Sequence, residues 1–153
     1  MTPLSAPPLA SYLGWWRWLV AASLGLMAFG LVLVLAPGFT RQGFSLLIYA
    51  SAGAIDEFGP APVAHITLLH AVLDAVMLGW GVLILWVVQG PFRRGLKEGW
   101  QMLAVSVVAW FVPDTAFSLW SGFWQNAALN LGFLALFAVP LGATYRVFHS
   151  GRS

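Results

Sequence analysis

The sequence contains no cysteine and very little charge. Without cysteine, the 153-residue chain cannot form a disulfide, a thiolate metal site, an iron–sulfur cluster or a cysteine nucleophile. Charged residues make up only 8% of the chain, against about 25% in soluble domains. Hydrophobic residues make up 60%. A water-soluble fold of this length could not bury so many apolar side chains, so we expect lipid to be the solvent.

Recognisable signatures of catalysis, phosphate binding and metal binding are also missing. The chain has no glycine-rich phosphate loop and no HExxH motif. Ser118, His70 and Asp114 could be drawn as a catalytic triad, but any four-helix bundle that holds a histidine allows that drawing. We therefore expect a protein that is not an enzyme, and we keep a small lipid-modifying membrane enzyme as an alternative.

Four long apolar runs predict an all-α membrane protein, with four transmembrane helices in one bundle and a single domain over 1–153. The spans are expected at 15–36, 63–89, 100–120 and 126–147, each long enough to cross a hydrocarbon core of about 30 Å. Residues 42–52 have apolar side chains at helical spacing but are too few to span, so they predict a short interfacial helix. Residues 1–14 contain three prolines and no charged side chain, which favours an irregular tail.

The few basic residues indicate how the chain lies in the membrane. All except Arg41 flank the same side of the predicted spans: Arg17, Arg93, Arg94, Lys97, Arg146 and Arg152. By the positive-inside rule, this side is cytoplasmic, so both termini are expected in the cytoplasm. The net charge is only +2 and the basic residues adjoin apolar runs. This pattern is typical of membrane orientation, and we expect no nucleic acid as a partner.

The second span opens with ionisable side chains inside an apolar run, and such residues usually have a function in a membrane. At 100° per residue, one stripe of this helix holds Thr67, His70, Asp74, Met77 and Gly81. The neighbouring row is small: Ala71, Ala75 and Gly79, and the first span has a similar pair in Ala21 and Gly25. Small residues at this spacing let helices approach closely, so we predict packing contacts at both places.

The third and fourth spans carry polar residues at about the same membrane level as the stripe. The rise per residue places these groups in the outer leaflet. We predict one polar cluster made of His70, Asp74, Asp114, Ser118, Asn126 and Asn130. One interpretation is a site for a small ligand, a lipid or a proton. The alternatives are a hydrogen-bonded group that only fixes helix register, and an ion site.

The histidines bear on haem and metal binding. Bis-histidine ligation needs two histidines at one level on different helices, but His65 and His70 share a span and His149 lies near the opposite side. We therefore expect no bis-histidine haem within one chain. His70 is a weak metal candidate, including for a haem or chlorin held by another subunit. The sequence identifies no cofactor.

Three short segments resemble a family of small bacterial four-helix integral membrane proteins that has no assigned activity. They are Gly79–Gly81, Trp110–Thr115 with Ser118, and Asn126–Asn130. The resemblance covers about 60–150. It implies a bacterial inner-membrane protein in which Asp114, Asn126 and Asn130 belong together.

These observations favour an interaction protein. We expect an accessory or assembly subunit of a larger membrane complex, such as an energy-transducing or pigment-bearing one. Its expected partners are the lipid bilayer and either other membrane subunits or further copies of itself. A binding or proton-handling module that uses the polar cluster is the alternative from a different class.

Overall fold

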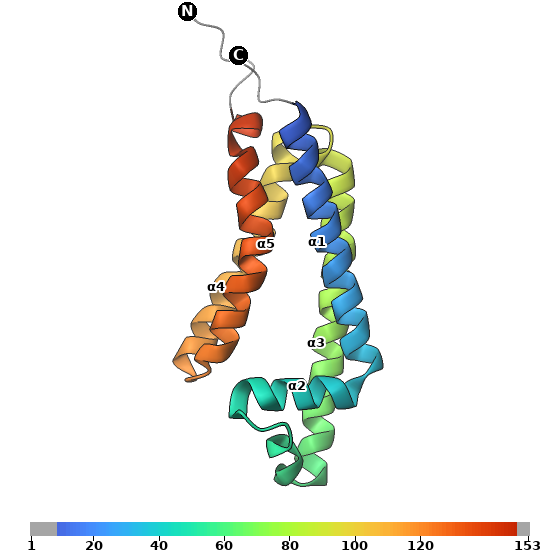
Figure 1. Ribbon diagram of the computed structural model, residues 1–153, viewed down its shortest axis with the longest axis vertical. Coiled ribbons are helices and arrows are strands. Elements are labelled where there is room, and N and C mark those ends of the chain that lie inside the picture. Colours follow the sequence, from blue (N-terminus) through green and yellow to red (C-terminus); the bar gives the residue numbers. More distant parts are fainter. Residues whose placement is uncertain (1–8, 150–153) are drawn as a thin grey trace, which may run out of the picture.

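The protein is an all-α, multi-pass membrane protein. The computed structural model describes residues 9–149 and is shown in Figure 1. Its α-helices are α1 (Leu9–Leu35), α2 (Pro37–Tyr49), α3 (Pro60–Val87), α4 (Lys97–Trp120) and α5 (Trp124–His149). A 3₁₀ turn, η1 (Ala54–Phe58), precedes α3, and a π-helical turn, η2 (Val88–Phe92), follows it. Four of these helices are long and apolar enough to cross a membrane, which confirms the predicted fold class.

Two helix boundaries differ from the sequence-based expectation, and proline explains the second of them. α1 begins at Leu9, so the predicted irregular tail was too long, and residues 1–8 lie outside the described part of the chain. Pro37 was expected to end the first helix, but it is also the first residue of α2. Proline suits this position, where its missing N–H is not needed and its φ is already helical. The short helix predicted at 42–52 therefore spans Pro37–Tyr49.

The second span is also longer than predicted. Apolar helix continues from Pro60 to Phe92, with a π-helical turn at its end. Pro91 lies inside this turn, and the Arg93 amide donates to the Val88 carbonyl at 3.1 Å, one residue further back than in an α-helix. The third and fourth spans match the prediction to within a few residues, at Lys97–Trp120 and Trp124–His149.

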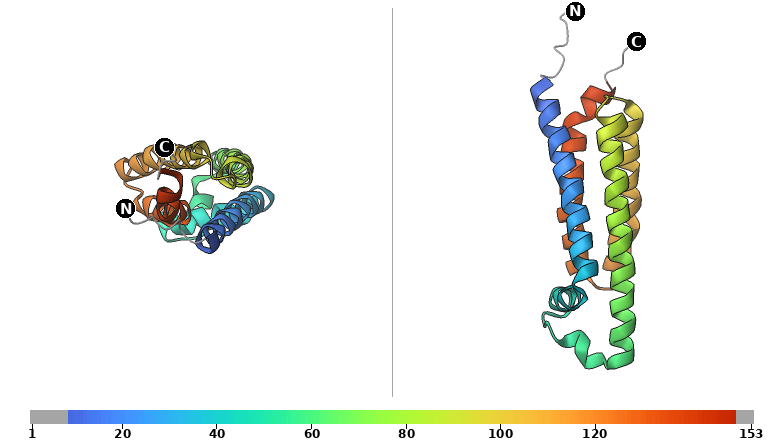
Figure 2. Two further views of the ribbon diagram at one scale, coloured as in Figure 1. Left: turned by 90° about the horizontal axis from the view of Figure 1, so that it is seen from above. Right: turned by 90° about the vertical axis from the view of Figure 1, so that its right-hand side faces the viewer.

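The helices form two antiparallel pairs, α1 with α3 and α4 with α5. We call one end of the bundle the basic end, because α1 begins there, α5 ends there, and the turn between η2 and α4 carries Arg93 and Arg94. The other end is the α2 end, where α2 lies across the bundle axis (Figures 1 and 2). In the view of Figure 1, the α4–α5 pair diverges from the α1–α3 pair toward the α2 end.

The position of the apolar core that the two pairs share is consistent with this divergence. Its buried side chains come from all four long helices and from η2. They are Leu19, Leu26, Ile84, Val88, Phe92, Leu103, Val107, Phe137, Leu141 and Phe148. Most of them belong to the half of the bundle nearer the basic end, so the two pairs are joined mainly there.

Short polar contacts hold α2 in place at the other end. The buried Thr40 hydroxyl donates to the Leu33 carbonyl at 2.8 Å, which ties α2 to the end of α1. The Ser45 hydroxyl donates to the Ser51 carbonyl at 2.6 Å and accepts from the Ile55 amide at 3.2 Å. These bonds satisfy polar groups that lie between α2 and η1, and they fix the orientation of α2.

The close approach of α1 and α3 occurs at glycines other than those predicted. A Cβ atom placed on Gly30 would lie 3.0 Å from the Asp74 carbonyl oxygen and 3.1 Å from the Leu78 amide nitrogen. A Cβ atom on Gly81 would lie 2.7 Å from Cγ of Met27. The backbones of α1 and α3 therefore meet along the stripe that contains Asp74 and Gly81.

The predicted small-residue row of α3 lies beside this contact and not in it. Gly79 has no atom within 4 Å of the position that its Cβ would take, and Ala75 is exposed, whereas Ala71 is half-buried. Gly25 of α1 likewise has no such neighbour, and both it and Ala21 are exposed. The row was predicted as the packing face because its residues are small, but α1 packs on the polar stripe beside it.

Candidate functional site

The α4–α5 hairpin carries a hydrogen-bonded polar network near the α2 end. Asp114 lies two turns before the end of α4, and Asn126 lies in the first turn of α5. The Asn126 side-chain amide donates to Oδ1 of Asp114 at 3.1 Å and to the Ser118 hydroxyl at 2.8 Å. The Ser118 hydroxyl in turn lies 2.7 Å from the Asp114 carbonyl oxygen and 3.3 Å from Oδ1 of Asp114. Each member of this network thus has a partner within the hairpin.

Asn130 lies one helical turn further along α5 and makes a separate bond to α4. It is buried, with 3% of its surface exposed, and its amide donates to the Thr115 hydroxyl at 3.3 Å. Asp114, Ser118, Asn126 and Asn130 therefore lie along one seam between α4 and α5. Interhelical hydrogen bonds of this kind fix the register of two helices in lipid. Thr115 was not among the predicted residues, although it is next to Asp114 in the sequence.

His70 and Asp74 lie on α3, where Asp74 is buried at the contact with α1 and His70 lies against α2. Asp74 is 5% exposed, and its Oδ2 is buried without a hydrogen-bond partner among the described residues. His70 is half-buried, and its Nδ1 is likewise buried and unpartnered within 9–149. The His70 ring stacks on Phe44 of α2, with ring centres 4.6 Å apart and planes inclined by 30°. Phe44 therefore covers the imidazole from the side of α2.

The structure divides the predicted polar cluster into two groups. No hydrogen bond or ion pair joins the α3 group to the α4–α5 network within residues 9–149. Within the hairpin, the structure does bring Asp114 and Asn126 together. Depth does not say which helices face each other, however, and the hairpin diverges from α3 toward the α2 end (Figure 1).

No family model, curated protein or solved structure matches this chain. The resemblance of 79–81, 110–115 and 126–130 to a family of small membrane proteins therefore stays a prediction. The geometry of the molecule carries the functional argument.

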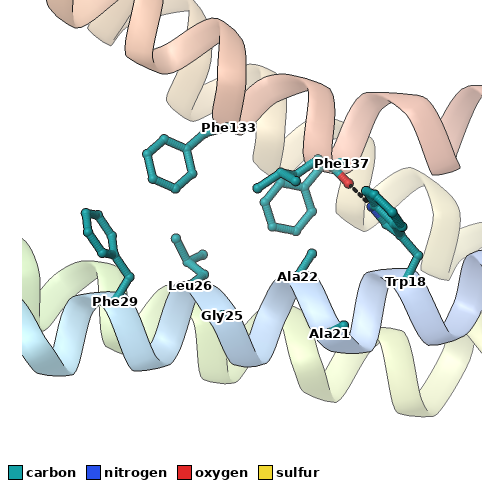
Figure 3. Close-up of a pocket in the computed structure, with 9 residues that line it drawn as sticks. Trp18, Ala21, Ala22, Gly25, Leu26, Phe29, Phe133 and Phe137 are labelled. Carbon is teal, nitrogen blue, oxygen red and sulfur yellow. Dashed lines mark hydrogen bonds between the residues drawn. The ribbon is translucent and has the colours of Figure 1, made fainter.

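An apolar groove separates α1 from α5 (Figure 3). Its volume is about 460 Å³. The α1 side is lined by Trp18, Ala21, Ala22, Gly25, Leu26 and Phe29, and the α5 side by Phe133, Leu136 and Phe137. The Phe29 and Phe133 rings lie 5.9 Å apart across the groove. The groove thus has aromatic side chains around small residues, and Ala21 and Gly25 are the pair that the sequence predicted to be a contact surface.

Trp18 bridges the groove by a bond that sequence reasoning missed. Its indole Nε1 donates to the Leu136 carbonyl at 2.9 Å. In an α-helix this carbonyl would accept from the amide four residues later, but that residue is Pro140, which has no N–H. The signal that could have revealed the bond is a proline inside the fourth span, because it leaves a carbonyl that needs another donor.

Mid-bundle aromatic residues join α3 to α4 and α5. The Trp80 indole donates to the Ser106 hydroxyl at 2.6 Å. Its ring centre lies 5.5 Å from that of Trp110 and 6.3 Å from that of Phe137. Both tryptophans therefore contribute to packing between the two helix pairs.

The three histidines occupy separate places. His65 lies on the exposed first part of α3, His70 faces α2, and the His149 ring lies 4.8 Å from that of Trp100 near the basic end. Across residues 9–149, no three His, Cys, Asp or Glu side chains come together as a metal site would require. His70 and Asp74, four residues apart on one helix, are the described residues that could share a small ligand.

Proposed function

We propose that this protein is a non-enzymatic accessory subunit that binds a transmembrane helix of a larger membrane complex. The groove between α1 and α5 is the observation that carries the proposal. Lipid tails are as apolar as leucine, so an apolar surface alone does not select a protein partner in the bilayer. The groove offers something more specific, because its small residues let a helix backbone approach closely.

The small residues lie on the α1 side. Gly25 has no atom within 4 Å of the place that a Cβ would occupy, and Ala21 lies one turn earlier on the same face. In lipid, helix association depends on van der Waals packing, and pairs of small residues four apart are typical of contact surfaces. Phe29 and Phe133 then form an aromatic edge against which the side chains of a partner helix would pack.

The distribution of the core explains why this groove stays open. The apolar side chains that join the two helix pairs gather toward the basic end. Toward the α2 end the pairs diverge, so α1 and α5 cannot close on each other along their whole length. A helix from a partner subunit would complete the packing that the chain leaves unfinished.

Extraction from native membranes in a mild detergent, followed by native gel electrophoresis, tests this proposal. We expect a band larger than the monomer, with a second membrane protein in it. The variant Gly25→Leu should reduce the large band, because its side chain occupies the groove. Ala28→Leu is the matched control, since Ala28 is exposed on the same helix but does not line the groove.

Three results would contradict the proposal. A lone monomer in native membranes would exclude a stable partner. A large band that contains only this chain, shown by co-purification of two differently tagged copies, would indicate that the protein forms a homo-oligomer and is not a subunit of another complex. An unchanged large band in Gly25→Leu would show that the partner binds elsewhere.

We propose further that the membrane is the cytoplasmic membrane and that the basic end faces the cytoplasm. The support is the excess of arginine and lysine at that end. Because the chain has no cysteine, single cysteines can report topology directly. A membrane-impermeant maleimide applied to intact cells should label Ser121→Cys near the α2 end and leave Glu98→Cys at the basic end unlabelled. The reverse pattern would overturn the orientation.

A further inference from the structure

We propose that the basic end carries a binding site for an anionic phospholipid, in which Arg93 and Arg94 hold the headgroup phosphate beside Trp16. The site lies where the first part of α1 meets the loop 93–96 between η2 and α4. It does not use the α1–α5 groove, and it does not depend on the accessory role argued above.

The first argument is the unpaired positive charge at this end. Of the five acidic residues of the chain, Glu98 alone lies here, in the first turn of α4. Within residues 9–149, no ion pair joins it to a basic side chain, whereas Arg41 at the α2 end is paired with Asp56 at 2.8 Å. The exposed basic side chains in the loop or beside it are Arg17, Arg93, Arg94 and Lys97. Their charge is therefore available to a ligand from outside the chain.

The second argument is that Arg93 is already held in place. Cζ of its guanidinium group lies 4.8 Å from the centre of the Trp16 ring, and Trp16 itself packs against the apolar core. A cation–π contact uses the face of the ring and leaves the N–H groups of the guanidinium free to donate. A planar guanidinium group can bind two oxygens of one phosphate at once. Arg93 would thus lose little side-chain freedom on binding.

The third argument is that the loop carrying the two arginines is anchored on both sides. The Tyr12 hydroxyl of α1 donates to the Phe92 carbonyl, and the rings of these two residues stack with their centres 6.0 Å apart. On the other side, a Cβ atom placed on Gly99 would lie 2.7 Å from the carbonyl carbon of Pro91, so α4 begins in direct contact with η2. The loop therefore presents its arginines from a fixed backbone, which lowers the entropy cost of binding.

The apolar surroundings favour a phospholipid over other anions. Large apolar side chains lie near the basic ones, and each exposes 42% or more of its surface: Leu13, Trp18 and Leu96. A phospholipid brings a phosphate and acyl chains to such a surface together, whereas inorganic phosphate or an acidic peptide would leave these side chains uncovered. An anionic headgroup is favoured over a zwitterionic one, because the latter would bring a second cation to a site that is already positive.

Native mass spectrometry of the full chain in detergent micelles, titrated with phosphatidylglycerol, tests the proposal. Phosphatidylcholine with the same acyl chains is the comparison, because it has the same phosphate but a compensating cation. We expect phosphatidylglycerol to bind more tightly, and we expect Arg93→Gln and Arg94→Gln each to weaken its binding roughly fivefold. Arg41→Gln is the matched control, since it removes the same charge at the α2 end and should leave the binding unchanged.

The variant Arg93→Lys tests whether the shape of the guanidinium group matters as well as its charge. Lysine keeps the charge but cannot bind two phosphate oxygens in one plane, so it should restore only part of the binding that Arg93→Gln loses. Because Arg93 is exposed, neither substitution removes a side chain from the core.

The proposal is overturned if the two lipids bind equally, or if both glutamine variants of the loop bind phosphatidylglycerol as the native chain does. An equal loss in Arg41→Gln would also overturn it, because net charge alone would then explain the attraction. Displacement of the lipid by an equal concentration of inorganic phosphate or of a glutamate-rich peptide would assign the site to a free anion or to an acidic protein segment instead.

Discussion

The α4–α5 hairpin and the α1–α3 pair use similar polar residues in opposite ways. In the hairpin, the Asp114 carboxylate accepts hydrogen bonds from Asn126 and Ser118 and lies between two helices that it connects. In the α1–α3 pair, the Asp74 carboxylate is more deeply buried, and its Oδ2 has no partner within the described part of the chain. The first acid is satisfied by its neighbours, and the second is not.

The difference shows why an ionisable residue in a membrane span cannot be interpreted from its presence alone. An acid whose bonds are all made inside the fold can be explained by structure, because it fixes the register of two helices. An acid that is enclosed without a partner is costly and calls for another reason. The functional prediction therefore applies more strongly to Asp74 than to Asp114.

The largest expected effect concerns the contact that encloses Asp74. In Gly30→Leu, the new side chain would meet the Asp74 carbonyl and the Leu78 amide, which are backbone atoms that cannot turn aside. Overpacking of this kind costs about 1–3 kcal/mol. We expect a loss of that size in the free energy of unfolding, measured in micelles by titration with sodium dodecyl sulfate.

Gly14→Leu is the control for this variant. Gly14 lies on the same helix, is exposed, and has no atom within 4 Å of its Cβ position. It should change the unfolding free energy by much less than Gly30→Leu. Equal losses in the two variants would mean that α1 and α3 do not depend on the close approach at Gly30, and Asp74 would then not be enclosed as described.

The next effect compares the two acids directly by the same substitution. At alkaline pH, where the carboxyl group is ionised, Asn at position 74 removes a charge that burial desolvates, so Asp74→Asn should stabilise the protein by about 1 kcal/mol. Asn at position 114 weakens a charge-assisted network, so Asp114→Asn should destabilise it by about 1 kcal/mol. The measurement is again the unfolding free energy in micelles. Effects of the same sign would remove the distinction between the two acids.

Much of the fold follows from the sequence, because apolar runs of sufficient length leave few alternatives in lipid. The four spans and a short helix between the first two were predicted from length and periodicity, and the structure confirms them. Proline was harder to interpret. Pro37 was taken as the end of one helix, whereas it is also the start of the next.

The candidate site was harder to predict from the sequence, because it depends on which sides of the helices are in contact. The periodicity grouped His70, Asp74 and Gly81 on one stripe; Asp74 and Gly81 are buried where α1 packs, and His70 is half-buried against Phe44 of α2. It could not show that α1 packs on that stripe, since the small residues at Ala75 and Gly79 indicated the neighbouring row. It also could not show that α4 and α5 turn Asp114 toward Asn126 and away from α3.

The smallest expected effect concerns a hydrogen bond that joins the two helix pairs. Trp18 donates to the Leu136 carbonyl, which Pro140 leaves without a helical donor. Trp18→Phe should cost roughly 0.6 kcal/mol, a typical value for a hydrogen bond between membrane helices. In a Pro140→Ala background the new amide can satisfy Leu136, so the same substitution should cost less. A double-mutant cycle on unfolding free energies measures this coupling. Additive effects would mean that Trp18 joins α1 to α5 by packing alone, and that its hydrogen bond to the Leu136 carbonyl contributes nothing to holding the two helix pairs together.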